Sequence, residues 1–212
     1  MKVRQIAFAC AAIAGTSLLT SVASAESTYG YNSAGTGTVT ATARVTVTVA
    51  VPKLILLRVG ASGSTVDTLA FTGAVNGIPG GINAAAITTA GNGNSLASGW
   101  DGTAPTFTAP ATQSLTAYAW TNSTGGGQLG LATVVNTALG GMSSSSITVA
   151  ATAGSGALPA HPGTTADNAN FGTFTRNTVH TATWAYGVSA ATLAAAAAGT
   201  YSQTTTYTAT LL

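Results

Sequence analysis

The feature that most constrains this chain is a stretch of strictly alternating side chains, residues 38–51, which ends at Pro52. Valine or alanine occupies the odd positions, and threonine or arginine occupies the even positions as far as residue 48. A period of two is typical of a β-strand with one buried face. At about 3.3 Å per residue, the segment Val39–Val51 would span roughly 43 Å, whereas a domain of this size is roughly 40 Å across. We therefore hypothesise that the run is a strand given to a neighbouring copy of the chain.

Residues 1–25 predict a cleavable secretory signal peptide. Two basic residues, Lys2 and Arg4, precede an apolar stretch from Ile6 to Leu19, and small residues lead up to Ala25. The single cysteine, Cys10, lies inside this stretch. The mature chain would therefore have no disulfide, and burial and strand pairing would have to stabilise it.

The remainder of the chain is long enough for one domain. We expect residues 26–52 to form an N-terminal tail and donor-strand extension, and residues 53–212 to form the domain. Beyond residue 25 the charges cancel, because four basic side chains face four acidic ones: Arg44, Lys53, Arg58 and Arg176 against Glu26, Asp67, Asp101 and Asp167. Without a basic patch we expect no nucleic-acid partner, and no later apolar run is long enough to span a membrane.

Strand-like patterns separated by turn residues recur through the rest of the chain. A single helix is expected at Ser189–Gly199, with these two residues as its caps. A loop is expected over residues 153–170. The fold class predicted by this pattern is all-β, an immunoglobulin-like antiparallel β-sandwich. The expected strands are Leu54–Val59, Thr68–Thr72, Ala86–Thr89, Gln113–Asn122, Leu129–Val135, Ser146–Ala151, Thr178–Val188 and Tyr201–Leu212.

Both ends of the predicted mature chain resemble one protein family. The sequence Thr-Val-Thr-Val-Ala-Val-Pro at 46–52, followed by Leu-Ile-Leu-Leu at 54–57, resembles the start of bacterial chaperone-usher pilins, especially the cysteine-free colonisation-factor class. The sequence Gly-Thr-Tyr-Ser at 199–202, followed by the alternating residues 204–211, resembles the closing strand of the same pilins. The resemblance covers about 35 residues of the chain.

This resemblance implies an immunoglobulin-like fold that lacks its last strand and is completed by a donor strand. The implied partners are identical subunits in a linear polymer, a periplasmic chaperone and an outer-membrane usher, and the implied location is a cell-surface fimbrium reached through the periplasm. The implied donor side chains are Val45, Val47, Val49 and Val51. The C-terminal strand that pairs with the chaperone would present Tyr201, Tyr207, Ala209 and Leu211. An added strand would hydrogen-bond to the unpaired backbone groups of an open sheet edge and would also cover its exposed apolar side chains.

Two alternatives stay open at the level of sequence. Val39–Val51 could instead be the internal first strand of a self-complete sandwich. The chain could also be a carbohydrate-binding adhesin, because Trp100 beside Asp101 in a glycine-rich loop is a pair that can stack on a sugar and hydrogen-bond to it, although such a pair more often anchors its own loop. We expect no enzyme, metal site or cofactor, because the mature chain has few titratable side chains and no Gly-x-Ser-x-Gly sequence.

Overall fold

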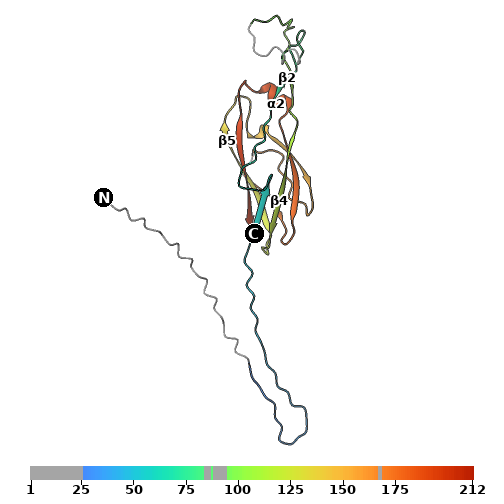
Figure 1. Ribbon diagram of the computed structural model, residues 1–212, viewed down its shortest axis with the longest axis vertical. Helices are drawn as coiled ribbons and strands as arrows, with labels where there is room; N and C mark the ends of the chain where they lie inside the picture. Colours follow the sequence, from blue (N-terminus) through green and yellow to red (C-terminus); the bar gives the residue numbers. More distant parts are fainter. Residues whose placement is uncertain (1–25, 84–86, 88–94, 167–168) are drawn as a thin grey trace, which may run out of the picture. The chain divides into compact units, whose positions relative to one another are not determined.

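The computed structural model describes residues 26–83, 87, 95–166 and 169–212. The chain divides into two compact units at the boundary between Val51 and Pro52. The second unit contains every strand assigned among the described residues (Figure 1). The expected signal peptide lies outside the described residues, and so does nearly all of the strand expected at Ala86–Thr89.

The second unit is an all-β fold of antiparallel sheets, which confirms the predicted fold class at the level of a β-sandwich. One sheet has four strands in the order β1-β4-β8-β6. Its members are β1 (Ile55–Val59), β4 (Gln113–Thr121), β8 (His180–Gly187) and β6 (Thr148–Ala153). The second sheet has three strands in the order β7-β5-β9, namely β7 (Ala169–Phe174), β5 (Gly127–Thr137) and β9 (Ser202–Leu211).

The remaining elements are short. β2 (Ala74–Val75) and β3 (Phe107–Thr108) form a separate two-stranded ladder. A 3₁₀ turn, η1 (Ser144–Ser146), precedes β6. One α-helix, α2 (Ala190–Ala195), connects β8 with β9. They lie in connections and leave the two main sheets to form the core.

The core lies between the two main sheets and depends on alternation in β4, β8 and β5. Trp184 and Leu129 are completely buried, and β4 contributes small residues at Ala117 and Ala119. Small side chains on β4 leave room for the indole of Trp184, because a close-packed interior must match large residues with small ones. On the opposite face of β4, the Arg58 guanidinium lies 4.0 Å from the centre of the Tyr118 ring.

Two sequence predictions of secondary structure were wrong. No strand is assigned at Thr68–Thr72, where Leu69 and Phe71 pack against the core from a loop. β7 was not predicted: it begins in the last two residues of the loop expected over 153–170, continues to Phe174, and pairs with β5 across an irregularity between Leu129 and Gly130. No strand is assigned along Val39–Val51 in the single chain. The expectation for this segment was a strand paired with another copy, and it stays a prediction.

The helix prediction was right at its start and wrong at its end. The Ser189 hydroxyl accepts a hydrogen bond from the Thr192 N–H at 3.0 Å, which is a regular N-cap. The helix ends at Ala195 instead of continuing to Gly199. The Ala197 N–H donates to the Gly140 carbonyl, and this tertiary hydrogen bond replaces a further helical turn.

Candidate functional site

One side of the sandwich, which we call the β1–β9 seam, leaves part of the core half-buried. The two strands are neighbours although they belong to different sheets. The core-facing side chains of this seam are only partly covered, unlike those of β4 and β8. The seam consists of Ile55, Leu57 and Val59 on β1 and Tyr207, Ala209 and Leu211 on β9.

Both strands of the seam are edge strands. Among the described residues, β1 pairs only with β4, and β9 pairs only with β5. Each therefore presents one row of backbone N–H and C=O groups that no ladder satisfies. Such an edge readily accepts another strand.

The outer edge of β6, at the other end of the four-stranded sheet, is covered by the chain itself. The Val149 N–H of β6 donates to the Gly163 carbonyl at 2.8 Å, and the Thr165 N–H donates to the Ile147 carbonyl at 3.3 Å. The loop at residues 163–165 therefore covers the outer edge of β6. Of the two edges of the four-stranded sheet, the one at β1 is therefore the open one.

A buried polar network connects β9 to the rest of the domain. The Tyr207 hydroxyl lies 2.9 Å from the Tyr186 hydroxyl and 2.9 Å from Nε2 of His161. Because the Gly163 N–H donates to Nδ1 of His161 at 3.2 Å, the imidazole is neutral with its proton on Nε2. The Tyr207 ring also lies 4.7 Å from that of Trp184. The network thus fixes the centre of β9 against β8 and the 154–166 loop.

Burial determines the protonation states of the side chains in this network. Burial lowers the pKa of His161 from its ordinary 6.5 to about 4, because lost hydration disfavours the charged imidazolium. Burial likewise raises the pKa of Tyr207, and the neighbouring Tyr186 adds to this rise. All three side chains are therefore neutral hydrogen-bonding groups at neutral pH.

The domain should lose stability on mild acidification. Because the pKa of His161 is about 4 in the folded chain and 6.5 when exposed, the unfolded chain binds the extra proton first. The stability is complete above about pH 6.5 and falls as the pH drops toward 4, by up to about 3 kcal/mol. Urea denaturation at a series of pH values measures this loss. His161→Gln should flatten the slope in this interval, and an unchanged slope in that variant would contradict the assignment.

The entry of the chain into the domain is fixed by the side chain of Asn122. Its Nδ2 donates to the Pro52 carbonyl at 2.7 Å, and its Oδ1 accepts from the Leu54 N–H at 2.8 Å. The Thr121 hydroxyl donates to the Leu54 carbonyl at 2.9 Å. These bonds extend the β1–β4 ladder by one step. They determine the direction in which residues 52–54 enter β1.

The four valines expected to act as donor side chains are strongly exposed. Their exposed fractions lie between 73% and 79%, and Val39 is less exposed, at 46%. Exposed valines at four consecutive odd positions are an apolar row that monomeric proteins normally bury. Of the residues expected on the closing strand, Tyr207, Ala209 and Leu211 share the core-facing side of β9, and Tyr201 directly precedes this strand.

The other candidate pair, Trp100 and Asp101, is largely engaged within its own loop. The Trp100 indole N–H donates to the Thr103 carbonyl at 2.6 Å. Asp101 Oδ1 accepts from the backbone N–H of Thr103 at 2.9 Å and also from its hydroxyl. These hydrogen bonds lower the pKa of Asp101. The ring of Trp100 is 58% exposed, so only its apolar face is available to a ligand.

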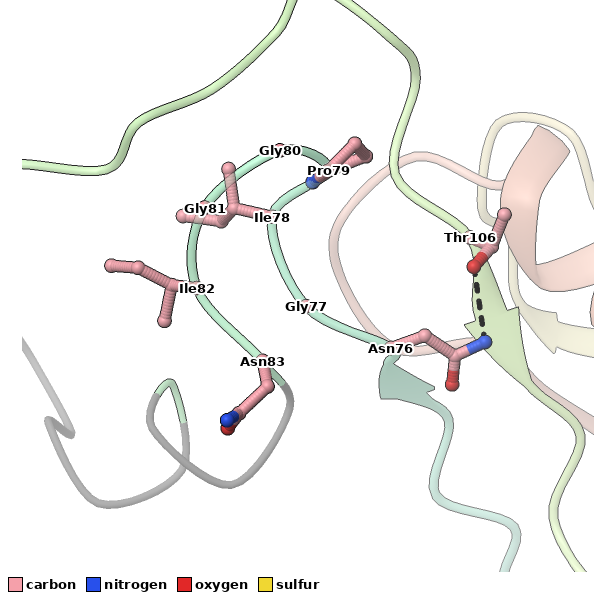
Figure 2. A pocket seen from close by; sticks show the side chains of 9 residues that line it. All are labelled: Asn76, Gly77, Ile78, Pro79, Gly80, Gly81, Ile82, Asn83 and Thr106. Atoms are coloured by element: carbon pink, nitrogen blue, oxygen red, sulfur yellow. Dashed lines mark hydrogen bonds between the residues drawn. The ribbon is translucent and has the colours of Figure 1, made fainter.

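A shallow pocket of about 310 Å³ lies beside this loop (Figure 2). The Asp101 N–H donates to the Pro79 carbonyl at 3.1 Å, which joins the two loops. The Asn76 side chain bonds to Thr106 at 3.0 Å and also to Thr108. The lining carries no charged side chain and consists of Asn76, Gly77, Ile78, Pro79, Gly80, Gly81, Ile82, Asn83 and Thr106.

Within the part of the chain that the structure describes, no three His, Cys, Asp or Glu side chains gather as metal ligands. No helix among these residues is long and apolar enough to cross a bilayer. Comparison with protein-family models, curated proteins and solved structures gave no match.

Sequence reasoning missed the His161–Tyr207–Tyr186 network and the role of Asn122. Alternation placed Tyr207 on the core side of its strand, but nothing local indicates a partner 46 positions away. Asn122 was predicted as the end of a strand. Its position directly after an alternating run and before Ser-Thr-Gly is a weak signal, since asparagine often ends strands by bonding to nearby backbone.

Proposed function

We propose that the chain is a structural subunit of a surface pilus or fimbria, exported through the periplasm and assembled by donation of the N-terminal extension to the next copy. In this proposal a periplasmic chaperone and an outer-membrane usher handle the subunit before assembly. The polymer supports adhesion or biofilm formation. The chain acts as a building element and not as an enzyme.

The observation that carries the proposal is the strand order together with the open seam. An immunoglobulin constant-type sandwich has strands A, B, E and D in one sheet and C, F and G in the other. By chain order and pairing, β1-β4-β8-β6 corresponds to A-B-E-D, and β5-β9 corresponds to C-F. No described strand lies at the position of G, beyond β9. The vacant position coincides with the half-buried β1–β9 seam.

The extension has the chemistry that this vacant position requires. A strand placed beside β9 would hydrogen-bond to its free edge and turn alternate side chains toward Leu57, Tyr207 and Ala209. Val45, Val47, Val49 and Val51 are the exposed apolar side chains with this spacing. Burying a valine contributes about 1.5 kcal/mol or more. Four valines would therefore favour association strongly.

The carbohydrate-binding alternative receives less support. The indole N–H of Trp100 and Oδ1 of Asp101 are both satisfied inside their loop. A sugar site needs polar groups that converge on the ligand. The geometry of Trp100 and Asp101 fits a pair that anchors its own loop better than a sugar site. We therefore do not propose carbohydrate binding as a second function.

Removing the extension tests the proposed function. Deletion of residues 26–51, with the leader kept and a cognate chaperone supplied, should leave a soluble folded subunit that forms no filaments in electron micrographs. The reason is that the seam remains while its occupant is lost. The full-length chain, expressed in the same way, is the control. Filaments formed by the deletion variant would exclude the extension as the donated strand.

A further inference from the structure

The extension is divided into a self-paired part and a free part. Residues 26–32 and 38–44 run antiparallel, with Glu26 opposite Arg44 and Thr28 opposite Thr42. The chain turns between these arms, where the Gly35 N–H donates to the Asn32 carbonyl at 3.2 Å. Figure 1 shows this segment turning back on itself. We call residues 26–44 the tail hairpin.

Side chains, rather than a backbone ladder, hold the tail hairpin together. The Arg44 guanidinium donates two hydrogen bonds of 3.0 Å to the Glu26 carboxylate, and these bonds lower the pKa of Glu26. The Thr28 hydroxyl accepts from the Thr42 N–H at 3.0 Å and donates to the Thr42 carbonyl at 2.9 Å. One threonine thus satisfies both backbone groups of its opposite residue, as a neighbouring strand would.

Gly30 makes the close approach of the two arms possible. A Cβ at this position would clash with Cγ1 of Val39 and would lie 2.8 Å from the Thr40 carbonyl oxygen. Any larger residue would therefore push the arms apart. The packing of Val39 against Gly30 also agrees with its lower exposure compared with Val45–Val51.

We infer that the tail hairpin limits the strand donated to a second copy to Val45–Val51. This inference rests on the proposed function. Where residues 26–32 lie alongside residues 38–44, the extension consists of two adjacent segments of the same chain. Neighbouring strands are about 4.8 Å apart. A position for one strand between β1 and β9 cannot admit both arms. The hairpin therefore acts as a stop that ends the inserted segment at residue 45.

Length and side-chain size agree with this limit. The seven residues of Val45–Val51 extend about 23 Å, between the lengths of β1, with five residues, and β9, with ten. The free part carries valine at every odd position, whereas the self-paired part carries Val39, which packs against Gly30, and the smaller Ala41 and Ala43. Four of the five valines of the run thus lie in the part that is proposed to be donated. Residues 38–44, the part of the alternating run that the donated strand does not need, form the second arm of the tail hairpin.

Hydrogen exchange of assembled full-length filaments tests this inference. Amides of residues 45–51 that pair with the neighbouring copy should exchange at least about 100-fold more slowly than those of residues 39–43. Gly30→Val should open the hairpin and extend the protected region into residues 39–43. Tyr31→Ala, a change on the same arm at a side chain that is 79% exposed, is the matched control and should leave the boundary at residue 45.

The outcomes separate this inference from the proposed function. Uniform protection from residue 39 to residue 51 in the wild-type filament, or an unmoved boundary in Gly30→Val, would overturn the hairpin stop while leaving donation intact. Absence of filaments, or absence of protection throughout 39–51, would overturn donation itself. Reversing the ion pair by Glu26→Arg with Arg44→Glu should keep the boundary at residue 45, whereas a boundary that moved would count against the hairpin.

Discussion

Val49→Asp is expected to abolish filament assembly, and Val47→Asp should have the same effect. In the proposed assembly each of these side chains is buried against the half-buried Leu57, Tyr207 and Ala209 of the β1–β9 seam of the next copy. An unpaired carboxylate there costs several kcal/mol, which is a large part of the stability of such a contact. In the unassembled chain both valines are almost fully solvated, with exposed fractions of 78–79%, so the variants should fold and be exported normally.

The even-numbered positions of the same segment provide the matched controls. Thr46→Asp and Thr48→Asp place the same charge on the outer face of the donated strand, where water solvates it. Filament yield by electron microscopy, normalised to subunit recovered from the periplasm, compares the two sets. Equal loss at odd and even positions would contradict the assigned register.

Tyr207→Asp should prevent recovery of folded subunit, whether or not a donor strand is present. The substitution removes the ring that lies 4.7 Å from that of Trp184 and both hydrogen bonds of the phenol. It also places a carboxylate beside Tyr186 and the neutral His161. Loss of a buried hydrogen-bonded network together with introduction of an unpaired charge belongs to the most destabilising class of substitutions, beyond about 4 kcal/mol.

Two variants separate packing from charge in this prediction. Tyr207→Phe keeps the ring and leaves the His161 N–H without its acceptor, so it should cost about 1–3 kcal/mol in urea denaturation. Thr208→Asp changes the adjacent exposed position and should cost less than about 0.5 kcal/mol. A Tyr207→Asp subunit recovered at wild-type yield would show that β9 is not held by this network.

The strands with regular alternation were the parts of the fold that the sequence predicted well. β4, β8 and β9 each combine a period of two with aromatic or β-branched residues, so their faces and approximate ends could be read directly. β7 escaped prediction because Asn170 and Gly172 are typical of a turn. It is a strand because β5 offers it a ladder partner, and pairing of this kind is not encoded locally.

The candidate site likewise has features that the sequence predicted and features that it did not. Alternation predicted which side of β9 faces the core, and the run of valines predicted an apolar row. Alternation alone could not predict that the seam is half-buried, because this depends on which strands become sheet edges; only the family resemblance implied an open edge. The tail hairpin was also missed, since Glu26 and Arg44 are eighteen positions apart and carry no local signal of pairing.

Donation of Val45–Val51 to another copy is tested most directly by cross-linking cysteines placed in the extension and the seam. Beyond the expected leader the chain has no cysteine, so a variant with Ala209→Cys and one of Val45→Cys, Val47→Cys, Val49→Cys or Val51→Cys contains only the intended pair. Core-facing residues directly opposite each other on paired strands have Cβ atoms about 5 Å apart, within reach of a short bis-thiol reagent. Thr208→Cys, which faces outward, replaces Ala209→Cys in the matched controls.

We predict that at least one of the four Ala209→Cys pairs gives a ladder of covalent multimers on a denaturing gel, and that the Thr208→Cys controls do not. A product that remains a monomer with an internal cross-link would mean that the extension fills its own domain. That result would contradict donation between copies and would favour a self-complete sandwich.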